Sequence, residues 1–171
     1  TKPGMPKVGT TLTRMVRTDE GSPAGGTLVS VRLVGVANGG VVGFRGSVSG
    51  GRDGLFAAAG DQGAVMLRSV VVVGDASFAG GGTFTQLAGA TLNDSGLWAF
   101  RGVVSTGRRA GVFRADASGP VVLGAGIALE DDPVAGSAGV TFRQMPSSLA
   151  PSINASGAVA FRASLGGAET G

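Results

Sequence analysis

The chain reads Asn93-Asp94-Ser95-Gly96-Leu97-Trp98-Ala99-Phe100-Arg101 near its middle, and two further segments repeat this pattern. Residues 37–45 read Ala-Asn-Gly-Gly-Val-Val-Gly-Phe-Arg, and residues 154–162 read Asn-Ala-Ser-Gly-Ala-Val-Ala-Phe-Arg. The three phenylalanines, Phe44, Phe100 and Phe161, lie 56 and 61 positions apart. Recurrence at a nearly fixed spacing is the signature of a repeat architecture, so we predict the fold one repeat at a time.

Each copy predicts a tight turn followed by an apolar strand. Asparagine at the first position of a turn can bond its side chain to the backbone two residues on. Glycine at the fourth position is the usual exit of a type I turn. These two positions are held by Asn93 and Gly96, by Asn154 and Gly157, and in the imperfect first copy by Ala37 and Gly40.

The residue before each phenylalanine is small, and this predicts how the sheets pack. Side chains alternate between the two faces of a strand, so the small residue lies on the face opposite the phenylalanine. Stacking the sheets face to face would therefore place each phenylalanine on a shallow site of the neighbouring sheet. The small residues are Gly43, Ala99 and Ala160.

Other landmarks keep the same register and set the repeat boundaries. A Thr followed by an apolar residue precedes each copy at residues 27–28, 83–84 and 141–142, and an acid precedes each of these pairs. We divide the single repeat region 1–171 into a partial repeat 1–24, repeats 25–80 and 81–138, and a partial repeat 139–171. The recurrent acids are Asp19, Asp75 and Asp132.

Four strands are predicted in each full repeat; in the second repeat they span residues 83–91, 97–104, 111–115 and 120–129. Short Gly-, Asn-, Asp- and Ser-containing loops between such strands are typical of antiparallel hairpins. The predicted fold is all-β, with tandem four-stranded antiparallel repeats arranged as β-propeller-like blades. A β-solenoid of stacked antiparallel sheets is the alternative. About three blades cannot close a ring, which predicts a piece of a longer protein or self-association that completes the ring.

Composition agrees with this prediction and narrows the partners. Glycine contributes 33 of 171 residues and lies between apolar runs, as expected for many tight turns. The net charge is only +3 and the arginines are dispersed, which does not favour nucleic acid as a partner. The apolar run at residues 70–73 is far shorter than the roughly 20 residues of a membrane span. The absence of cysteine excludes disulfides and thiolate chemistry.

The Asn-x-x-Gly-x-x-x-Phe pattern, at Asn93/Gly96/Phe100 and Asn154/Gly157/Phe161, resembles that of the bacterial "choice-of-anchor tandem repeat NxxGxxxF-containing" proteins. The Gly-Asp pair at residues 74–75 and the Gly-Thr-Phe at residues 82–84 match further landmarks of that family. The resemblance implies a secreted or cell-surface bacterial protein, an extracellular location and a β-propeller. It implies no catalytic residues.

The acidic residues, and the residue types that the chain lacks, limit the catalytic and metal sites that it can form. Without histidine or cysteine, the common zinc sites and the Ser–His and Cys–His nucleophile pairs cannot form. We interpret Asp19, Asp75 and Asp132 as turn caps at one equivalent corner of every repeat. A Ca²⁺ site at this corner is the alternative, because Ca²⁺ takes several oxygen ligands from one loop. No other cofactor is predicted.

Arginine recurs at two places in the repeat. Arg52 and the pair Arg108–Arg109 occupy the same turn, between the second and third strands, and predict a positive rim that attracts an anionic glycan. The arginine after each phenylalanine is expected to pair with a carboxylate or to cover a strand edge. Trp98 has no counterpart in the other copies, and we interpret it as a core residue.

The sequence leaves three functions open. The first is a non-enzymatic scaffold or ligand-binding repeat module of a secreted or cell-surface bacterial protein. The second is a structural, self-assembling spacer. The third is an enzyme that acts on polysaccharide through paired carboxylates.

Overall fold

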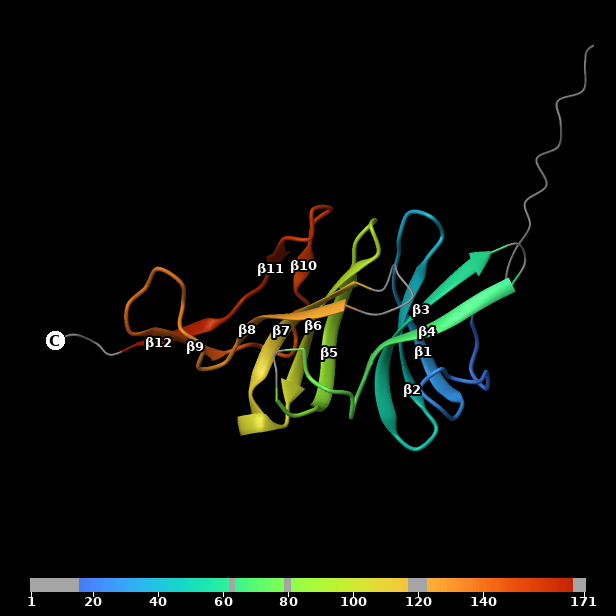
Figure 1. Ribbon diagram of the computed structural model, residues 1–171, viewed down its shortest axis with the longest axis horizontal. Helices are drawn as coiled ribbons and strands as arrows, with labels where there is room; N and C mark the ends of the chain where they lie inside the picture. Colours follow the sequence, from blue (N-terminus) through green and yellow to red (C-terminus); the bar gives the residue numbers. More distant parts are fainter. Residues whose placement is uncertain (1–15, 62–63, 79–80, 117–122, 168–171) are drawn as a thin grey trace, which may run out of the picture.

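The computed structural model describes residues 16–61, 64–78, 81–116 and 123–167 (Figure 1). Two four-stranded antiparallel sheets form the larger part of the fold, and the strand order in each sheet follows the chain order. The first sheet contains β1 (Leu28–Val36), β2 (Val42–Val48), β3 (Arg52–Asp61) and β4 (Ala64–Val72). The second contains β5 (Phe84–Leu92), β6 (Leu97–Val104), β7 (Ala110–Asp116) and β8 (Leu123–Leu129). The prediction of an all-β fold of tandem four-stranded repeats is confirmed.

The two sheets repeat each other in register as well as in topology. Phe44 on β2 lies opposite Phe56 on β3, with ring centroids 5.4 Å apart and ring planes 19° apart. Phe100 on β6 lies opposite Phe113 on β7, at 5.6 Å and 22°. Cross-strand aromatic pairs stabilise a sheet and fix its register, because a slip by one residue would move every ring to the other face.

The partial third repeat folds as a long hairpin whose two arms pair in two separate short ladders. Strands β9 (Val140–Gln144) and β12 (Ser164–Gly167) pair with each other, and β10 (Ser152–Ile153) pairs with β11 (Val159–Ala160). Eight positions separate the first and last residues of β1 and of β5, but eleven separate Phe142 from Ile153. The three extra residues cannot join the ladder, so residues 145–151 leave it as a loop between β9 and β10.

The turn that precedes the second strand is built as predicted. The N–H of the fourth residue donates to the carbonyl of the first in all three copies. The fourth residue has a left-handed backbone, which favours glycine because a Cβ would crowd the neighbouring carbonyl. The φ angles are 79° at Gly40, 83° at Gly96 and 82° at Gly157.

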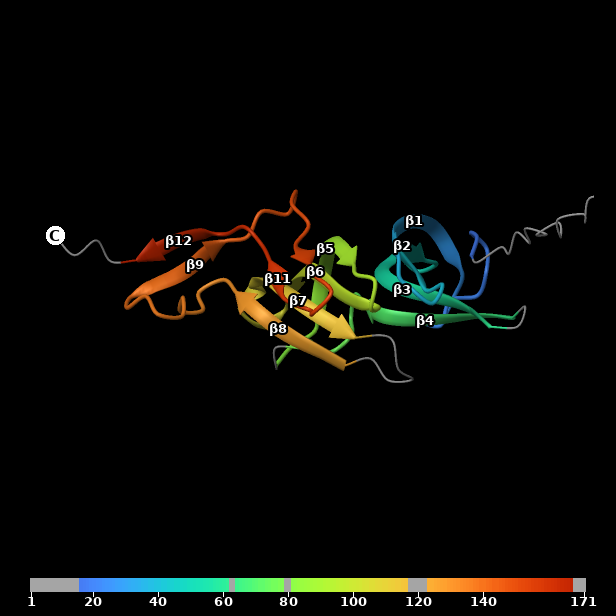
Figure 2. The ribbon, with the colours of Figure 1, turned by 90° about the horizontal axis from the view of Figure 1, so that it is seen from above.

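The sheets lie side by side in an elongated row, from β1–β4 at one end to β9 and β12 at the other (Figures 1 and 2). The described residues form this open row and no closed barrel or ring. One hydrophobic cluster covers the outer face of the first sheet, a second lies between the first and second sheets, and a third lies between the second sheet and the third repeat. The contacts between neighbouring repeats therefore carry much of the core.

Candidate functional site

The contact between the first two sheets depends on a small residue in one and a large residue in the other. Trp98 on β6 is completely buried, and its ring lies against Gly43 on β2. A Cβ added at Gly43 would lie 2.6 Å from the Trp98 Cη2 atom, closer than carbon atoms approach in real structures. The phenylalanine face of one sheet meets the small-residue face of its neighbour as predicted, but the side chain that lies on Gly43 is that of Trp98, two residues before Phe100, and not the signature phenylalanine. The indole Nε1 has no hydrogen-bond partner among the described residues, so packing of the ring explains the tryptophan.

Both contacts between repeats use the same two faces. At the first, the phenylalanine face of the second sheet packs with Leu55 and Val71 of the first sheet. At the second, Phe142 and Phe161 of the third repeat pack in a cluster with the equivalent residues of the second sheet. Each sheet therefore presents its phenylalanine face to the preceding repeat and its other face to the following one. We call this contact the stacking interface.

Asn93 connects the second repeat to the third. Its Oδ1 atom accepts the N–H groups of Ser95 at 3.0 Å and of Leu97 at 2.8 Å, which closes its own turn. Its Nδ2 atom donates to the carbonyl of Asn154 in the next repeat at 2.6 Å. Asn93 is the one buried polar residue among those described, so both ends of its amide act where water is excluded.

The three Asn-x-x-Gly turns are joined in a row. The N–H of Asn38 in the first turn donates to the carbonyl of Asp94 in the second at 2.9 Å. Asn154 repeats half of the Asn93 arrangement, because its Oδ1 accepts the N–H of Ala158 at 2.8 Å. Its Nδ2 donates to no described residue, and Asn154 is exposed at the end of the row.

The recurrent acids cap turns. The carboxylate of Asp75 accepts the N–H of Val72 at 2.8 Å, and that of Asp132 accepts the N–H of Leu129 at 3.1 Å. In the first repeat the equivalent bond, from the N–H of Arg17 at 3.1 Å, goes to Glu20. The assignment of Asp19 to this position was therefore wrong by one residue.

Backbone geometry explains why Asp19 was mistaken for the capping acid. Asp19 has a φ of 66° and occupies the left-handed position that Gly74 and Asp131 hold in the other repeats. Aspartate tolerates this conformation better than most residues. Among the described residues, no three acidic, histidine or cysteine side chains come together to hold a metal ion.

Replacing Asp75 with alanine is expected to lower the free energy of unfolding by about 1 kcal/mol, as for other lost caps. The cause is loss of the acceptor for the Val72 N–H. Denaturant unfolding of Asp75→Ala and of the exposed turn variant Asp94→Ala checks this, and Asp94→Ala is expected to cost less. We also expect millimolar Ca²⁺ to leave the midpoint of the parent chain unchanged. A rise in the midpoint that requires Asp75 would contradict the capping role.

Two of the three arginines predicted to form a positive rim bind the chain itself. The Arg52 guanidinium donates to the carbonyl of Ala24, and the Arg109 guanidinium donates to the carbonyl of Glu130 and pairs with Asp132. Arg52 therefore attaches the turn between β2 and β3 to the turn that precedes β1, whereas Arg109 attaches the turn between β6 and β7 to the acidic turn that follows β8. Arg108 is exposed and makes no side-chain hydrogen bond or ion pair with the described residues.

Two of the three arginines after the signature phenylalanines, Arg45 and Arg101, lie toward the next repeat. Arg45 pairs with Asp53 at 2.8 Å, as expected for a carboxylate partner. Arg101 instead donates its Nε to the carbonyl of Met145, in the loop of the third repeat, at 2.8 Å. Arg162 lies in the last repeat of the row, is exposed, and makes no side-chain hydrogen bond or ion pair with the described residues.

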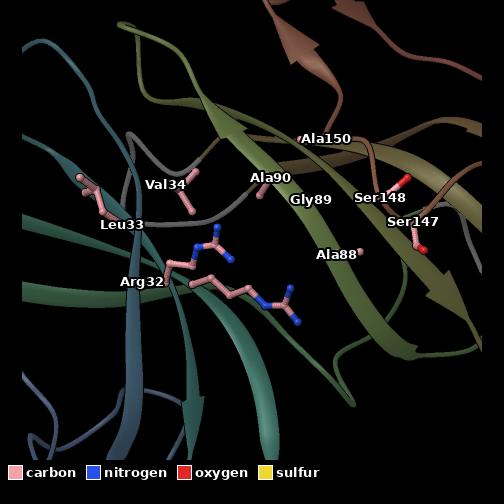
Figure 3. Close-up of a pocket in the computed structure, with 10 residues that line it drawn as sticks. Arg32, Leu33, Val34, Ala88, Gly89, Ala90, Ser147, Ser148 and Ala150 are labelled. Carbon is pink, nitrogen blue, oxygen red and sulfur yellow. The ribbon is translucent and has the colours of Figure 1, made fainter.

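A groove lies where the first sheet, the second sheet and the loop of the third repeat meet. It has a volume of about 390 Å³ and continues into a second hollow of about 410 Å³ that shares Arg45, Ala88 and Ser147 with it. Figure 3 shows Arg32 extending from β1 into this space, with Ala88 and Ala90 of β5 beside it. Sequence reasoning missed Arg32 because it does not recur, and missed Ser147 because it lies in an insertion.

Residues 7–171 match the pattern of a protein family described as "Family of unknown function (DUF7453)". The chain belongs to this family. The DUF7453 match extends over both complete sheets and the third repeat, and so over both stacking interfaces. No curated protein and no solved structure matches the chain. No described helix has the length and apolar character needed to cross a membrane.

Proposed function

We propose that this DUF7453 chain is a non-enzymatic scaffold module of a secreted or cell-surface bacterial protein. In this function the chain stacks four-stranded sheets head to tail through the stacking interface. The observation that carries the proposal is the position of Asn93, whose amide closes its own turn and binds the backbone of the next repeat. The signature residue is thus used in the contact between repeats.

Two further residues of the signature, Gly43 and Arg101, and the non-recurrent Arg114 support the same proposal. Gly43 accommodates Trp98 across the stacking interface. Arg101 and Arg114 donate to backbone carbonyls of the third repeat, those of Met145 and Gly157. Residues of the repeat signature, together with Trp98 and Arg114, therefore make contacts between neighbouring repeats.

The two faces of the stacking interface differ, so the same contact can form again between each repeat and the next. Such a head-to-tail contact generates a ring when the rotation closes and an open array when it does not. The β-propeller and the solenoid are these two outcomes. The resemblance to the NxxGxxxF repeat proteins supports the extracellular setting.

Duplicating residues 25–80 in place, so that residue 80 is followed by a second copy of 25–80, tests whether repeats are interchangeable stacking units. Trp98 would still contact a Gly43, and Val42 of the new copy, smaller than tryptophan, would lie on the other Gly43. We expect one cooperative urea transition with a higher midpoint. The slope of the free energy of unfolding against urea concentration should rise by roughly half, because this slope scales with the surface area exposed on unfolding.

A matched control carries the same 56 residues in permuted order, 53–80 before 25–52. It is expected to leave the midpoint unchanged or lower it, because the strands no longer stack in register. A separate, less stable transition for the in-register copy would contradict the proposal, since it would show that a sheet does not gain stability from its neighbours.

A further inference from the structure

We propose that the groove between the first two sheets binds an acidic sugar chain, through the guanidinium groups of Arg32 and Arg45. The shared chemistry is a carboxylate or sulfate group carried on a saccharide. This inference goes beyond the scaffold function, because the groove is complete within the described residues and needs no additional repeat.

The groove is built where the repeat pattern is broken. The loop over residues 145–151, which carries the three extra residues of the third repeat, passes over β5 and places Ser147 and Ser148 in the wall. It passes so close that a Cβ added at Gly89 would lie 2.7 Å from the Cα of Ala150. Gly89 also lies at an irregularity in the pairing of β5 with β6. The inserted loop thus packs directly on Gly89 and forms a groove wall that the regular repeat lacks.

The charge of the groove is positive in the first hollow. The charged residues of the first hollow are Arg32 and Arg45, and the described lining there contains no acid. Arg32 is exposed and makes no side-chain hydrogen bond or ion pair with the described residues. Asp53, in the second hollow, offsets Arg45 in part, at 2.8 Å. Arg32 is therefore the principal binding residue for the acidic group of the sugar, and Arg45 is the secondary one.

The lining selects the class of ligand. A guanidinium group offers parallel N–H donors that match the two oxygens of a carboxylate or sulfate. The hydroxyls of Ser147 and Ser148 can exchange hydrogen bonds with sugar hydroxyls. The two connected hollows form a trough that suits an extended chain. The described lining carries no aromatic ring on which a nucleic-acid base could stack, so we favour a saccharide over single-stranded nucleic acid.

Calorimetric titration of the full chain with oligogalacturonate, with a sulfated dextran oligomer and with a neutral malto-oligosaccharide of equal length tests the proposal. We expect at least one acidic probe to bind and the neutral probe not to bind. Arg32→Gln should weaken that binding about tenfold. The matched control, Arg108→Gln, removes an equally exposed charge outside the groove and should leave the affinity unchanged.

Four results would overturn the proposal. The first is an equal loss of affinity in both arginine variants, which would indicate non-specific attraction, and the second is equal affinity for the neutral sugar. The third is tighter binding of a single-stranded oligonucleotide than of either acidic sugar. The fourth is no binding of any probe at millimolar concentration. The urea midpoint of Arg32→Gln should equal that of the parent chain, so a lost affinity is not a lost fold.

Discussion

Gly43→Ala lowers the free energy of unfolding by about 2 kcal/mol, the range expected for overpacking a buried contact. The new methyl group would lie 2.6 Å and 2.7 Å from two carbons of the buried Trp98 ring, which cannot move without displacing the sheet. The third close atom is the end of the flexible Leu92 side chain, which can move aside. Urea unfolding of the two chains measures the loss.

The Trp98→Ala background is expected to abolish or reverse the destabilisation caused by Gly43→Ala. Trp98→Ala alone is expected to cost about 4 kcal/mol, because it leaves a cavity at a fully buried site. In that background Gly43→Ala should cost nothing or stabilise by about 0.5 kcal/mol, since alanine is favoured over glycine within a strand. Equal losses in both backgrounds would show that Gly43 is sensitive for a reason other than the tryptophan ring.

Asn93→Asp lowers the free energy of unfolding by about 3 kcal/mol at neutral pH. The substitution keeps the acceptor that closes the turn but replaces the donor to the Asn154 carbonyl, at 2.6 Å, with a second oxygen. A buried carboxylate that faces a carbonyl oxygen loses both its hydration and its hydrogen bond. Urea unfolding measures the difference.

Asn154→Asp is the matched control for this prediction. Asn154 closes its own turn in the same way, but its Nδ2 donates to no described residue and the side chain is exposed. We expect a cost below about 0.5 kcal/mol, as for most surface substitutions. Similar losses in the two variants would contradict the assignment of the Asn93 Nδ2 atom to the contact between repeats.

The strand positions could be predicted because their determinants are local. Alternation, turn glycines and the recurrent Phe placed β6 at its observed bounds and placed β5 and β7 to within one residue. The contact between unlike faces of neighbouring sheets also followed from the small residue before each phenylalanine, although the residue that lies on Gly43 is Trp98. The Thr-apolar pairs mark a recurrent bridge, since Thr27, Thr83 and Thr141 each pair with the turn before them.

Contacts between distant turns could not be predicted from the same patterns. Asn93 was read correctly as a turn former, but its second role depends on where the next repeat lies, 61 residues later. The capping acid of the first repeat was misassigned because Asp19 and Glu20 are adjacent and only backbone geometry separates them. Ser49 and Ser105, which accept the N–H groups of Thr27 and Thr83 across 22 residues, were missed although their equal spacing was a usable signal.

Residue-resolved amide hydrogen exchange of the parent chain and of Gly43→Ala tests most directly whether stacking holds the sheets together. Gly43 lies in the first sheet, whereas β6 and β7 are the central strands of the second. Protection is expected to fall in both sheets of Gly43→Ala, by a similar free energy, because the cluster between them is shared. A loss confined to β2 and its neighbours in the first sheet, with β6 and β7 unchanged, would contradict it.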